Sequence, residues 1–160
     1  WGMLVSLYQA YDVLSHDTMF VLAAFFIPVL IILSIWVNDT MAYIVGSFIG
    51  KTPFSKISPK KTWEGTIGGM ILAVVAIGFL FPLLFYRDHL AALYPMLITL
   101  SAIAAVAGTM GDLLESKLKR MAGVKDSGRM MPEHGGFLDR FDSLLIATPC
   151  IWLFVRLFLD

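Results

Sequence analysis

Residues 18–37 read TMFVLAAFFIPVLIILSIWV, a run of 20 residues that is almost wholly apolar. A helix of this length spans the hydrocarbon core of a bilayer, which is about 30 Å thick. The whole chain has the same character, since 58% of its 160 residues are hydrophobic and only 15% are charged, against about 25% in soluble domains. Its mean hydropathy is +0.79. The sequence therefore predicts an integral membrane protein.

Further apolar stretches follow this run toward the C-terminus. Residues 38–50 continue it after an interruption by Asn38-Asp39-Thr40, and we expect them either to cross the membrane or to re-enter it. Three more predicted spans cover residues 66–86, 90–115 and 143–159. We therefore expect an all-α, polytopic membrane bundle of four to five transmembrane segments, with residues 1–160 forming a single membrane domain. The chain begins without Met, directly in amphipathic sequence, which favours the C-terminal part of a longer protein.

Basic residues are concentrated in two of the connecting segments. Ten of the twelve Lys and Arg residues lie in residues 51–61 and 117–140. Two predicted spans separate these segments, so both lie on the same side of the membrane, and the positive-inside rule makes that side cytoplasmic. The prediction is a multi-pass protein of the cell (inner) membrane with a polar site that opens to the cytoplasm. The formal net charge is zero, which gives no electrostatic support for nucleic-acid binding.

One acidic residue, Asp39, lies inside the apolar region. A charge at membrane depth is costly and indicates a functional site. The alternative is that Asp39 caps a helix that starts after a break in the span. The sequence leaves both interpretations open, although the cost of the charge favours function.

The first basic segment reads KTPFSKISPKKTWE over residues 51–64. Ser58-Pro59 is typical of an N-cap followed by proline at the first helical position. The backbone N–H groups of a helix start beside Lys60 and Lys61 would bind a phosphate. The alternative is a juxtamembrane segment that touches anionic lipid head groups.

The second basic segment, SKLKRMAGVKDSGRMMPEHGGFLDRFD (residues 116–142), combines six Lys and Arg residues with four carboxylates and a histidine. An ordinary solvated loop explains the basic residues but not the carboxylates placed against both membrane edges. If the preceding helix continues into this segment, Asp112, Glu115, Ser116 and Lys119 fall on one of its faces.

The carboxylates of the chain favour a metal that prefers oxygen ligands. Asp139 and Asp142 are three residues apart and point the same way in a helix that enters the last span. Together with Asp39 and Asp112 they suggest Mg²⁺, which takes one or two carboxylates and substrate phosphates. Zinc is disfavoured because the single Cys150 lies in an apolar run and no His pair has ligand spacing. Carboxylates, a metal and surrounding Lys and Arg side chains are typical of phosphoryl or nucleotidyl transfer.

Gly135-Gly136 and His134 allow several roles. The two glycines would let the backbone approach a phosphate closely, or they form a simple turn. His134 is a candidate general base or a hydrogen-bond donor to a phosphate, or it caps this turn. No Ser or Cys nucleophile with an adjacent base is evident in the sequence, so covalent catalysis has little support.

Four motifs occur in order along the chain: Asn38-Asp39-Thr40-x-Ala42-Tyr43, SPKKTWEG at residues 58–65, Gly111-Asp112, and S-x-L-K-R-x4-K-D-S-G-x3-P-x-H-G-G-F-x-D-R-F-D at residues 116–142. Together they resemble the CDP-diacylglycerol synthase family, also called the phosphatidate cytidylyltransferases, and AGVKDSGR is similar to its bacterial branch. One departure is Glu133, where the family pattern has Gly; it adds a negative charge near the phosphates. Members of the family are usually longer, with further N-terminal spans.

The resemblance implies transfer of the cytidylyl group of CTP to phosphatidate, which gives CDP-diacylglycerol and pyrophosphate in phospholipid biosynthesis. The lipid phosphate is already anionic, so it attacks the α-phosphorus without an enzyme nucleophile, and Mg²⁺ is the expected cofactor, with a second cation left open. The implied metal ligands are Asp112 and Asp139. The implied catalytic set consists of Asp39, Asp112, Lys125, Asp126, His134, Asp139 and Asp142. The implied substrate-binding set consists of Ser58, Lys60, Lys61, Thr62, Glu64, Ser116, Lys119, Arg120, Gly135, Gly136 and Arg140.

Two other functions stay open from the sequence. A CTP-dependent polyprenol or phytol kinase would transfer the terminal phosphate to a lipid alcohol and would need a base for the neutral hydroxyl; the complete set of motifs argues against it. A cation transporter would also place carboxylates in its spans. The expected partners are CTP, phosphatidate and membrane lipids, without nucleic acid, and the oligomeric state, a homodimer included, is open.

Overall fold

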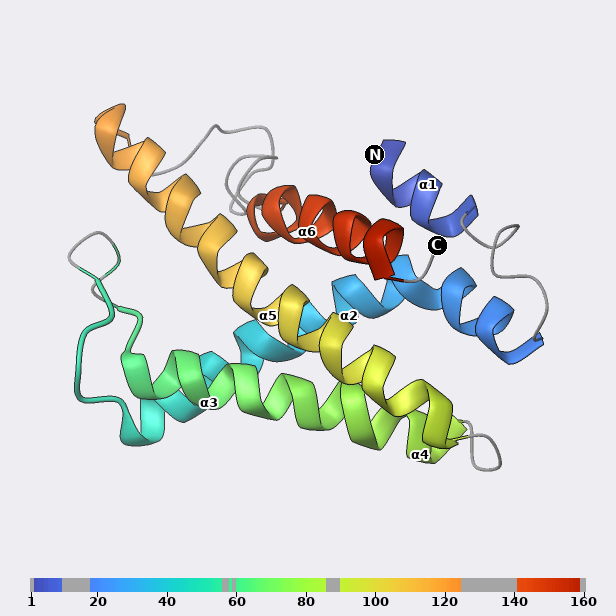
Figure 1. The fold of residues 1–160 in the computed structure, drawn as a ribbon. Coiled ribbons are helices and arrows are strands. Elements are labelled where there is room, and N and C mark those ends of the chain that lie inside the picture. Colours follow the sequence, from blue (N-terminus) through green and yellow to red (C-terminus); the bar gives the residue numbers. More distant parts are fainter. Residues whose placement is uncertain are drawn as a thin grey trace, which may run out of the picture.

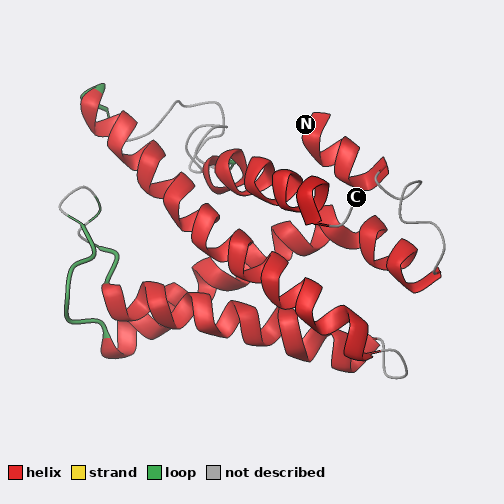
Figure 2. Cartoon of the chain, viewed as in Figure 1, coloured by secondary structure: helices red, strands yellow, loops and turns green. Residues whose placement is uncertain are grey.

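The computed structural model describes residues 2–9, 18–55, 58, 60–85, 90–124 and 141–158. In this part of the chain all the regular structure is helical, apart from one isolated β-bridge between Pro53 and Thr62 (Figure 2). The predicted all-α class is confirmed. The elements are α1 (Gly2–Gln9), α2 (Thr18–Ile49), α3 (Trp63–Ala73), the π-helical segment η2 (Val74–Leu80), α4 (Phe81–Phe85), α5 (Leu90–Met121) and α6 (Asp142–Phe158).

Three helical stretches of the described residues are long and apolar enough to cross a membrane. They cover Ile27–Ile49, Trp63–Leu84 and Tyr94–Met121, with mean hydropathies of 1.7, 2.5 and 1.7. Helix α6 is shorter, with 17 residues. The total of four to five transmembrane segments stays a prediction.

The alternative of a helix break at Asn38-Asp39-Thr40, with Asp39 as the cap, is wrong. Helix α2 runs without a break from Thr18 to Ile49, so residues 18–37 and 38–49 form one element. The side chain of Asn38 donates a hydrogen bond to Thr109 Oγ1 on α5 (3.3 Å). Because this amide pairs with a neighbouring helix and not with its own backbone, it does not compete with the helical hydrogen bonds.

Figure 1 shows how the helices are arranged. Segments α3, η2 and α4 follow one another in a rod, and α5 crosses this rod obliquely. Helix α2 contacts both α3 and α5, while α6 packs on α5 and α1 contacts α2 and α6. The C-terminal end of α2, the N-terminal ends of α3 and α6 and the C-terminal end of α5 all point toward the left in Figure 1. This end of the bundle carries the candidate site.

Small residues bring α2 and α3 into close contact. A Cβ atom on Gly65 would lie 2.6 Å from the carbonyl oxygen of Ala42, and one on Gly69 would lie 2.7 Å from the carbonyl oxygen of Asn38. Real Cβ atoms do not approach backbone atoms so closely, so only glycine fits at both positions. The missing side chains at these positions therefore allow the close packing of α3 on α2.

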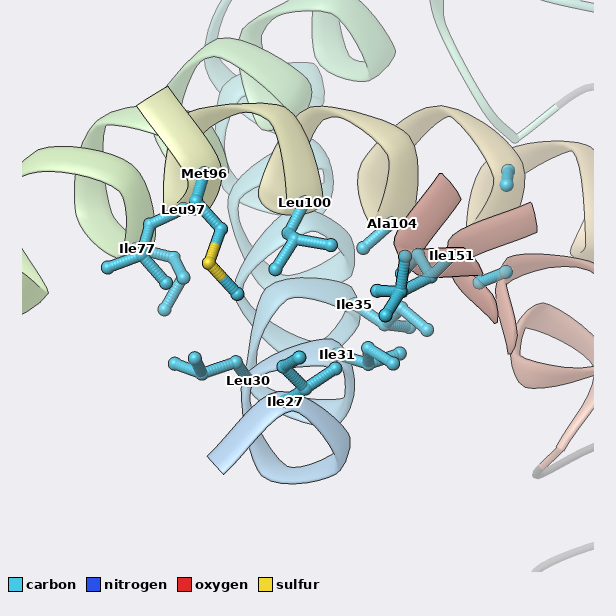
Figure 3. Close-up of a cluster of buried hydrophobic side chains, with 13 residues drawn as sticks. Ile27, Leu30, Ile31, Ile35, Ile77, Met96, Leu97, Leu100, Ala104 and Ile151 are labelled. Atoms are coloured by element: carbon cyan, nitrogen blue, oxygen red, sulfur yellow. The ribbon is translucent and has the colours of Figure 1, made fainter. Parts of the chain in front are cut away.

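An apolar core joins α2, α5 and α6 behind the site. Ile27, Ile31 and Ile35 recur every four residues along one face of α2, and they pack with side chains of η2, α5 and α6 (Figure 3). Leu97 of α5 and Ile151 of α6 are 2% and 0% exposed within this core. The core therefore fixes α2, α5 and α6 relative to one another, and with them the polar residues at their ends.

Candidate functional site

A cavity of about 480 Å³ lies at the end of the bundle where the loop after α2 leads into α3. Its volume is in the range of small-molecule sites. It brings together six of the predicted site residues, which come from α2, the loop and α5: Asp39, Ser58, Lys60, Lys61, Thr62 and Asp112. The other lining residues are Asn38, Ala42, Tyr43, Gly46, Ser47, Thr66 and Thr109.

An ion pair between Lys61 and Asp112 joins the first basic segment to α5. Both side chains are partly buried, with 29% and 25% of their surfaces exposed. The backbone of Lys61 is fixed on both sides, because its N–H donates to the carbonyl oxygen of Ser58 (3.1 Å) and its carbonyl oxygen accepts from the N–H of Phe54 (2.8 Å). The pair places this basic segment and the C-terminal half of α5 at the same end of the bundle, as the charge distribution predicts.

Two further carboxylates lie near this pair. Asp39 lines the same cavity from α2. Lys61, Asp112 and Asp142 all lie close enough to Asp39 to interact with it electrostatically. Three helices, α2, α5 and α6, thus each contribute one carboxylate to the region around Asp39.

Tight packing between α5 and α6 brings Asp142 to this region. A Cβ atom on Gly111 would lie 2.5 Å from the carbonyl oxygen of Asp142 and 3.0 Å from Cα of Ser143. The absence of a side chain at Gly111 lets the start of α6 contact α5 directly beside Asp112. The Gly-Asp motif therefore has two separate roles, one in helix packing and one in the cavity.

The start of α3 differs from the sequence-based expectation. The helix begins at Trp63, and its N-cap is Thr62, which has extended backbone angles (φ −115°, ψ 151°) and accepts a hydrogen bond from the N–H of Gly65 (3.2 Å). Ser58 as N-cap is therefore wrong. Backbone hydrogen bonds from Phe54 to Lys61 and from Trp63 to Thr52 hold residues 61–63 against 52–54, so this stretch is extended and not helical. Ser58 still lines the cavity.

Glu64 lies in the first turn of α3 and holds the loop. Its carboxylate accepts from the hydroxyl of Thr52 (2.8 Å), the backbone N–H of Thr52 (3.2 Å) and the backbone N–H of Lys51 (3.2 Å). Glu64 is not among the described residues that line the cavity. These contacts favour a positioning role for Glu64 over the direct substrate contact that the sequence suggests.

In an assay of the reaction that the motif resemblance implies, we expect Glu64→Ala to raise KM by about three- to tenfold, with a smaller change in kcat, because the loop that carries Lys60 and Lys61 loses its anchor. Steady-state kinetics and limited proteolysis of residues 51–62 check this together. Glu64→Gln keeps one acceptor oxygen and serves as the conservative control, with an intermediate effect. A rise in KM without faster proteolysis would instead indicate that Glu64 contacts the substrate directly.

Sequence analysis did not single out Thr109, which lies deep in the cavity. Thr109 is 5% exposed, and its hydroxyl donates to the carbonyl oxygen of Ala105 (2.9 Å), so it accepts from Nδ2 of Asn38. The amide of Asn38 is thereby oriented, and its Oδ1 is buried without a hydrogen-bond donor in the described part of the chain. The position of Thr109, three residues before Asp112, is the sequence signal for this contact, since such residues share a helix face.

The predicted shared face on α5 is confirmed. Ser116 Oγ lies 3.4 Å from Asp112 Oδ1, and Lys119 Nζ lies 3.4 Å from Glu115 Oε2. Glu115 is only 4% exposed. Arg120 is exposed in the last turn of α5. Among the described lining residues of the cavity, α5 is represented by Thr109 and Asp112 only, so substrate contacts of Ser116, Lys119 and Arg120 stay predictions.

The remaining predicted site residues lie outside the described residues: Lys125, Asp126, His134, Gly135, Gly136, Asp139 and Arg140. In the described ranges no group of three or more His, Cys, Asp and Glu side chains is placed to hold a metal ion. Asp39 and Asp112 nevertheless line one cavity and offer hard oxygen donors, which suit Mg²⁺. The described residues thus fit part of a magnesium site, to be completed by other ligands such as phosphate oxygens.

Known proteins resemble this chain along most of its length. The chain is 40% identical over 144 residues to a phosphatidate cytidylyltransferase of Staphylococcus saprophyticus. This alignment covers 88% of this chain and 50% of that protein. It is 45% identical over 125 residues to one of Bacillus subtilis, an alignment that covers 78% of this chain and 45% of that protein. It is 42% identical over 138 residues to one of Synechocystis, an alignment that covers 83% of this chain and 44% of that protein. The chain therefore spans about half the length of the curated relatives it matches. With its apolar helices, this similarity identifies a multi-pass membrane protein.

A family profile agrees with these relatives. The profile described as "Cytidylyltransferase family" matches residues 2–158, which is nearly the whole chain and includes all four motifs. The resemblance that the motifs indicate is thus confirmed, and the chain belongs to the cytidylyltransferase family.

Proposed function

We propose that this protein transfers the cytidylyl group of CTP to phosphatidate, with CDP-diacylglycerol and pyrophosphate as products. The observation that carries the proposal is the cavity that combines Asp39, Asp112 and Lys61 at one end of a membrane bundle. The relatives named as phosphatidate cytidylyltransferases support the choice of substrates. A site for two polyanions needs both cations and carboxylates that hold a metal, and this cavity offers both kinds of side chain.

The basic loop supplies the groups that hold phosphates. Lys60 and Lys61 line the cavity beside the hydroxyls of Ser58 and Thr62. Their ammonium groups neutralise the triphosphate and the lipid phosphate as these approach each other, which removes the main electrostatic obstacle to the reaction. We assign the same task to Lys119, Arg120, Lys125 and Arg140, and we assign Asp126 and His134 to ordering their segment.

The carboxylates hold the divalent cation. We assign Asp112 and Asp139 as ligands of Mg²⁺, with Asp39 and Asp142 as further ligands or as groups that orient the first two. The bound ion would neutralise phosphate oxygens and so make the α-phosphorus more electrophilic. The electrostatic proximity of Asp39, Asp112 and Asp142 supports this assignment.

The reaction is a single displacement at phosphorus. An oxygen of the lipid phosphate attacks the α-phosphorus of CTP and forms a new P–O bond. The bond from the α-phosphorus to the oxygen that bridges to the β-phosphorus breaks, and that oxygen leaves with pyrophosphate. The attacking oxygen is already anionic, so no side chain has to remove a proton, and the residues of the cavity bind, orient and neutralise the reactants.

The site lies at the membrane surface in this proposal. The cavity opens beside the lysine-rich loop, and positive loops are retained on the cytoplasmic side. We therefore place the cavity at the cytoplasmic face of the cell (inner) membrane. There a soluble nucleotide and a membrane lipid both reach it.

The test uses CTP labelled in either the α- or the γ-phosphate, phosphatidate micelles and Mg²⁺. We expect the α-label to enter the lipid phase and the γ-label to leave as pyrophosphate. EDTA and Asp139→Asn should each abolish the transfer. Entry of the γ-label into a lipid alcohol would identify a lipid kinase, and ion flux without nucleotide dependence would identify a transporter; either result would refute the proposal.

A further inference from the structure

A second hollow lies between the rod that contains α3 and helix α5. It has a volume of about 260 Å³, and every described residue that lines it is apolar. Met70 of α3 and Val75 of η2 form one wall, and Ala102, Ala105 and Val106 of α5 form the other. Val75 and Val106 are each 47% exposed. The hollow is therefore a groove with one exposed side in the described part of the chain.

The groove continues the polar cavity along the same two helices. Thr66 lines the cavity and Met70 lines the groove, one helical turn apart on α3. On α5, Thr109 lines the cavity and Ala105 lines the groove, again one turn apart. Four residues of helix rise about 6 Å. The groove thus begins about one turn beyond the cavity, in the direction away from the lysine-rich loop.

We propose that this groove holds one acyl chain of the lipid whose phosphate is bound in the cavity. The inference rests on the proposed function and adds to it where the lipid lies. An anionic lipid has a charged end and a long apolar end joined within a few bonds. A polar cavity and an apolar groove one turn apart, with an open side, offer each end its matching surface.

The shape of the groove suits part of one acyl chain. Its width results from small side chains on one wall, Ala102 and Ala105, opposite Met70. A segment of a single hydrocarbon chain fits between these walls.

The groove orients the lipid more than it attracts it. A chain that leaves the bilayer for the groove stays in an apolar medium, so the gain from the hydrophobic effect is small. What the groove supplies is alignment of the phosphate with the cavity. We therefore expect the groove to matter for lipids whose chains are long enough to enter it.

The test fills the groove from both walls with Ala102→Phe and, separately, Val75→Phe. The control is Leu84→Phe, which adds the same ring at a position that is 68% exposed in α4 and outside both hollows. For each protein, kcat/KM is measured with dioleoyl and with dihexanoyl phosphatidate in the same mixed micelles. We expect the ratio of the long-chain to the short-chain value to fall about tenfold in both groove variants and to stay constant in the control.

A second measurement does not depend on turnover. Phosphatidate with a photoreactive diazirine in the middle of one acyl chain is cross-linked to the wild-type protein, and the labelled peptides are mapped. We expect label on residues 70–75 and 102–106, and its loss in Ala102→Phe. If the wild type labels there but transfers no cytidylyl group, the proposed function fails while the groove assignment stands.

Two results would overturn the groove assignment. If the ratio of kcat/KM for the long-chain lipid to that for the short-chain lipid is unchanged in both variants, the groove holds bulk lipid or another part of the protein. Label spread evenly over exposed positions such as Leu84 would mean the same.

Discussion

Asp112→Asn is expected to lower the rate of cytidylyl transfer by about 10²–10³-fold, the usual cost of removing one group that stabilises the charge in a transition state. Asp112 is the carboxylate that pairs with Lys61 and lines the cavity together with Asp39. Asparagine has nearly the same shape, so the cavity keeps its volume. What the variant loses is the negative charge that the proposed function assigns to metal binding.

The measurement is kcat with saturating CTP at a series of Mg²⁺ concentrations. We expect the Mg²⁺ concentration for half-maximal rate to rise in Asp112→Asn. Leu114→Asn is the matched control, because Leu114 lies on the same helix, is 48% exposed and is not among the described residues that line the cavity, and its rate should fall less than about threefold. Equal losses in the two variants would mean that the effect comes from disturbed packing of α5 and not from the missing charge.

The same substitution also tests the ion pair itself. Removing one partner leaves Lys61 in a partly buried position without the carboxylate it contacts. We expect a loss in stability of about 1–3 kcal/mol, between the values for exposed and buried pairs. The double variant Lys61→Met/Asp112→Asn removes both partners of the pair, so it should recover part of this stability. The recovery is only partial because Asp39 also lies near Lys61 and loses this cation. Thermal unfolding in detergent of both single variants and the double variant gives the coupling free energy between Lys61 and Asp112. If the stability losses of the two single variants add up to that of the double variant, the pair contributes nothing.

The sequence predicted those features that depend on local pattern. Apolar runs long enough for a membrane identified the long helices, and the three- and four-residue spacing on α5 placed Ser116 beside Asp112. Each of these inferences needs only residues that are close in the sequence.

The features that the sequence did not predict depend on distant partners. A break in the span after Asn38 was one of two alternatives, yet the helix continues and the amide of Asn38 pairs with Thr109, which lies 71 residues away. Ser58 looked like the N-cap, yet backbone hydrogen bonds join residues 52–54 to residues 61–63, and the helix starts only after Thr62. In both cases a tertiary contact decides between local alternatives that the sequence leaves nearly equal. The loop contacts of Glu64 with Lys51 and Thr52 likewise join residues more than ten positions apart, while its implied substrate binding stays a prediction.

Gly111→Ala is expected to destabilise the protein by about 1–3 kcal/mol and to lower transfer activity as well. The new Cβ would lie 2.5 Å from the carbonyl oxygen of Asp142 and 3.0 Å from Cα of Ser143. Both are backbone atoms of α6, so they move only if the helix moves. Separation of α5 from α6 would displace Asp142 from the region of Asp112 and Asp39.

Gly108→Ala on the same helix provides the matched control. Its Cβ would meet Cγ1 of Ile35 at 3.2 Å and Cβ of Ser143 at 3.6 Å, and a side chain shifts by a few tenths of an ångström more easily than a backbone. Alanine also favours helix over glycine by up to about 1 kcal/mol, so Gly108→Ala should be neutral or stabilising. We expect the two midpoints of thermal unfolding in detergent to move in opposite directions or to differ clearly, with activity lost only in Gly111→Ala. Equal midpoints and equal activities would mean that α6 does not pack on Gly111 in the membrane, and Asp142 would then have no structural reason to lie beside Asp112.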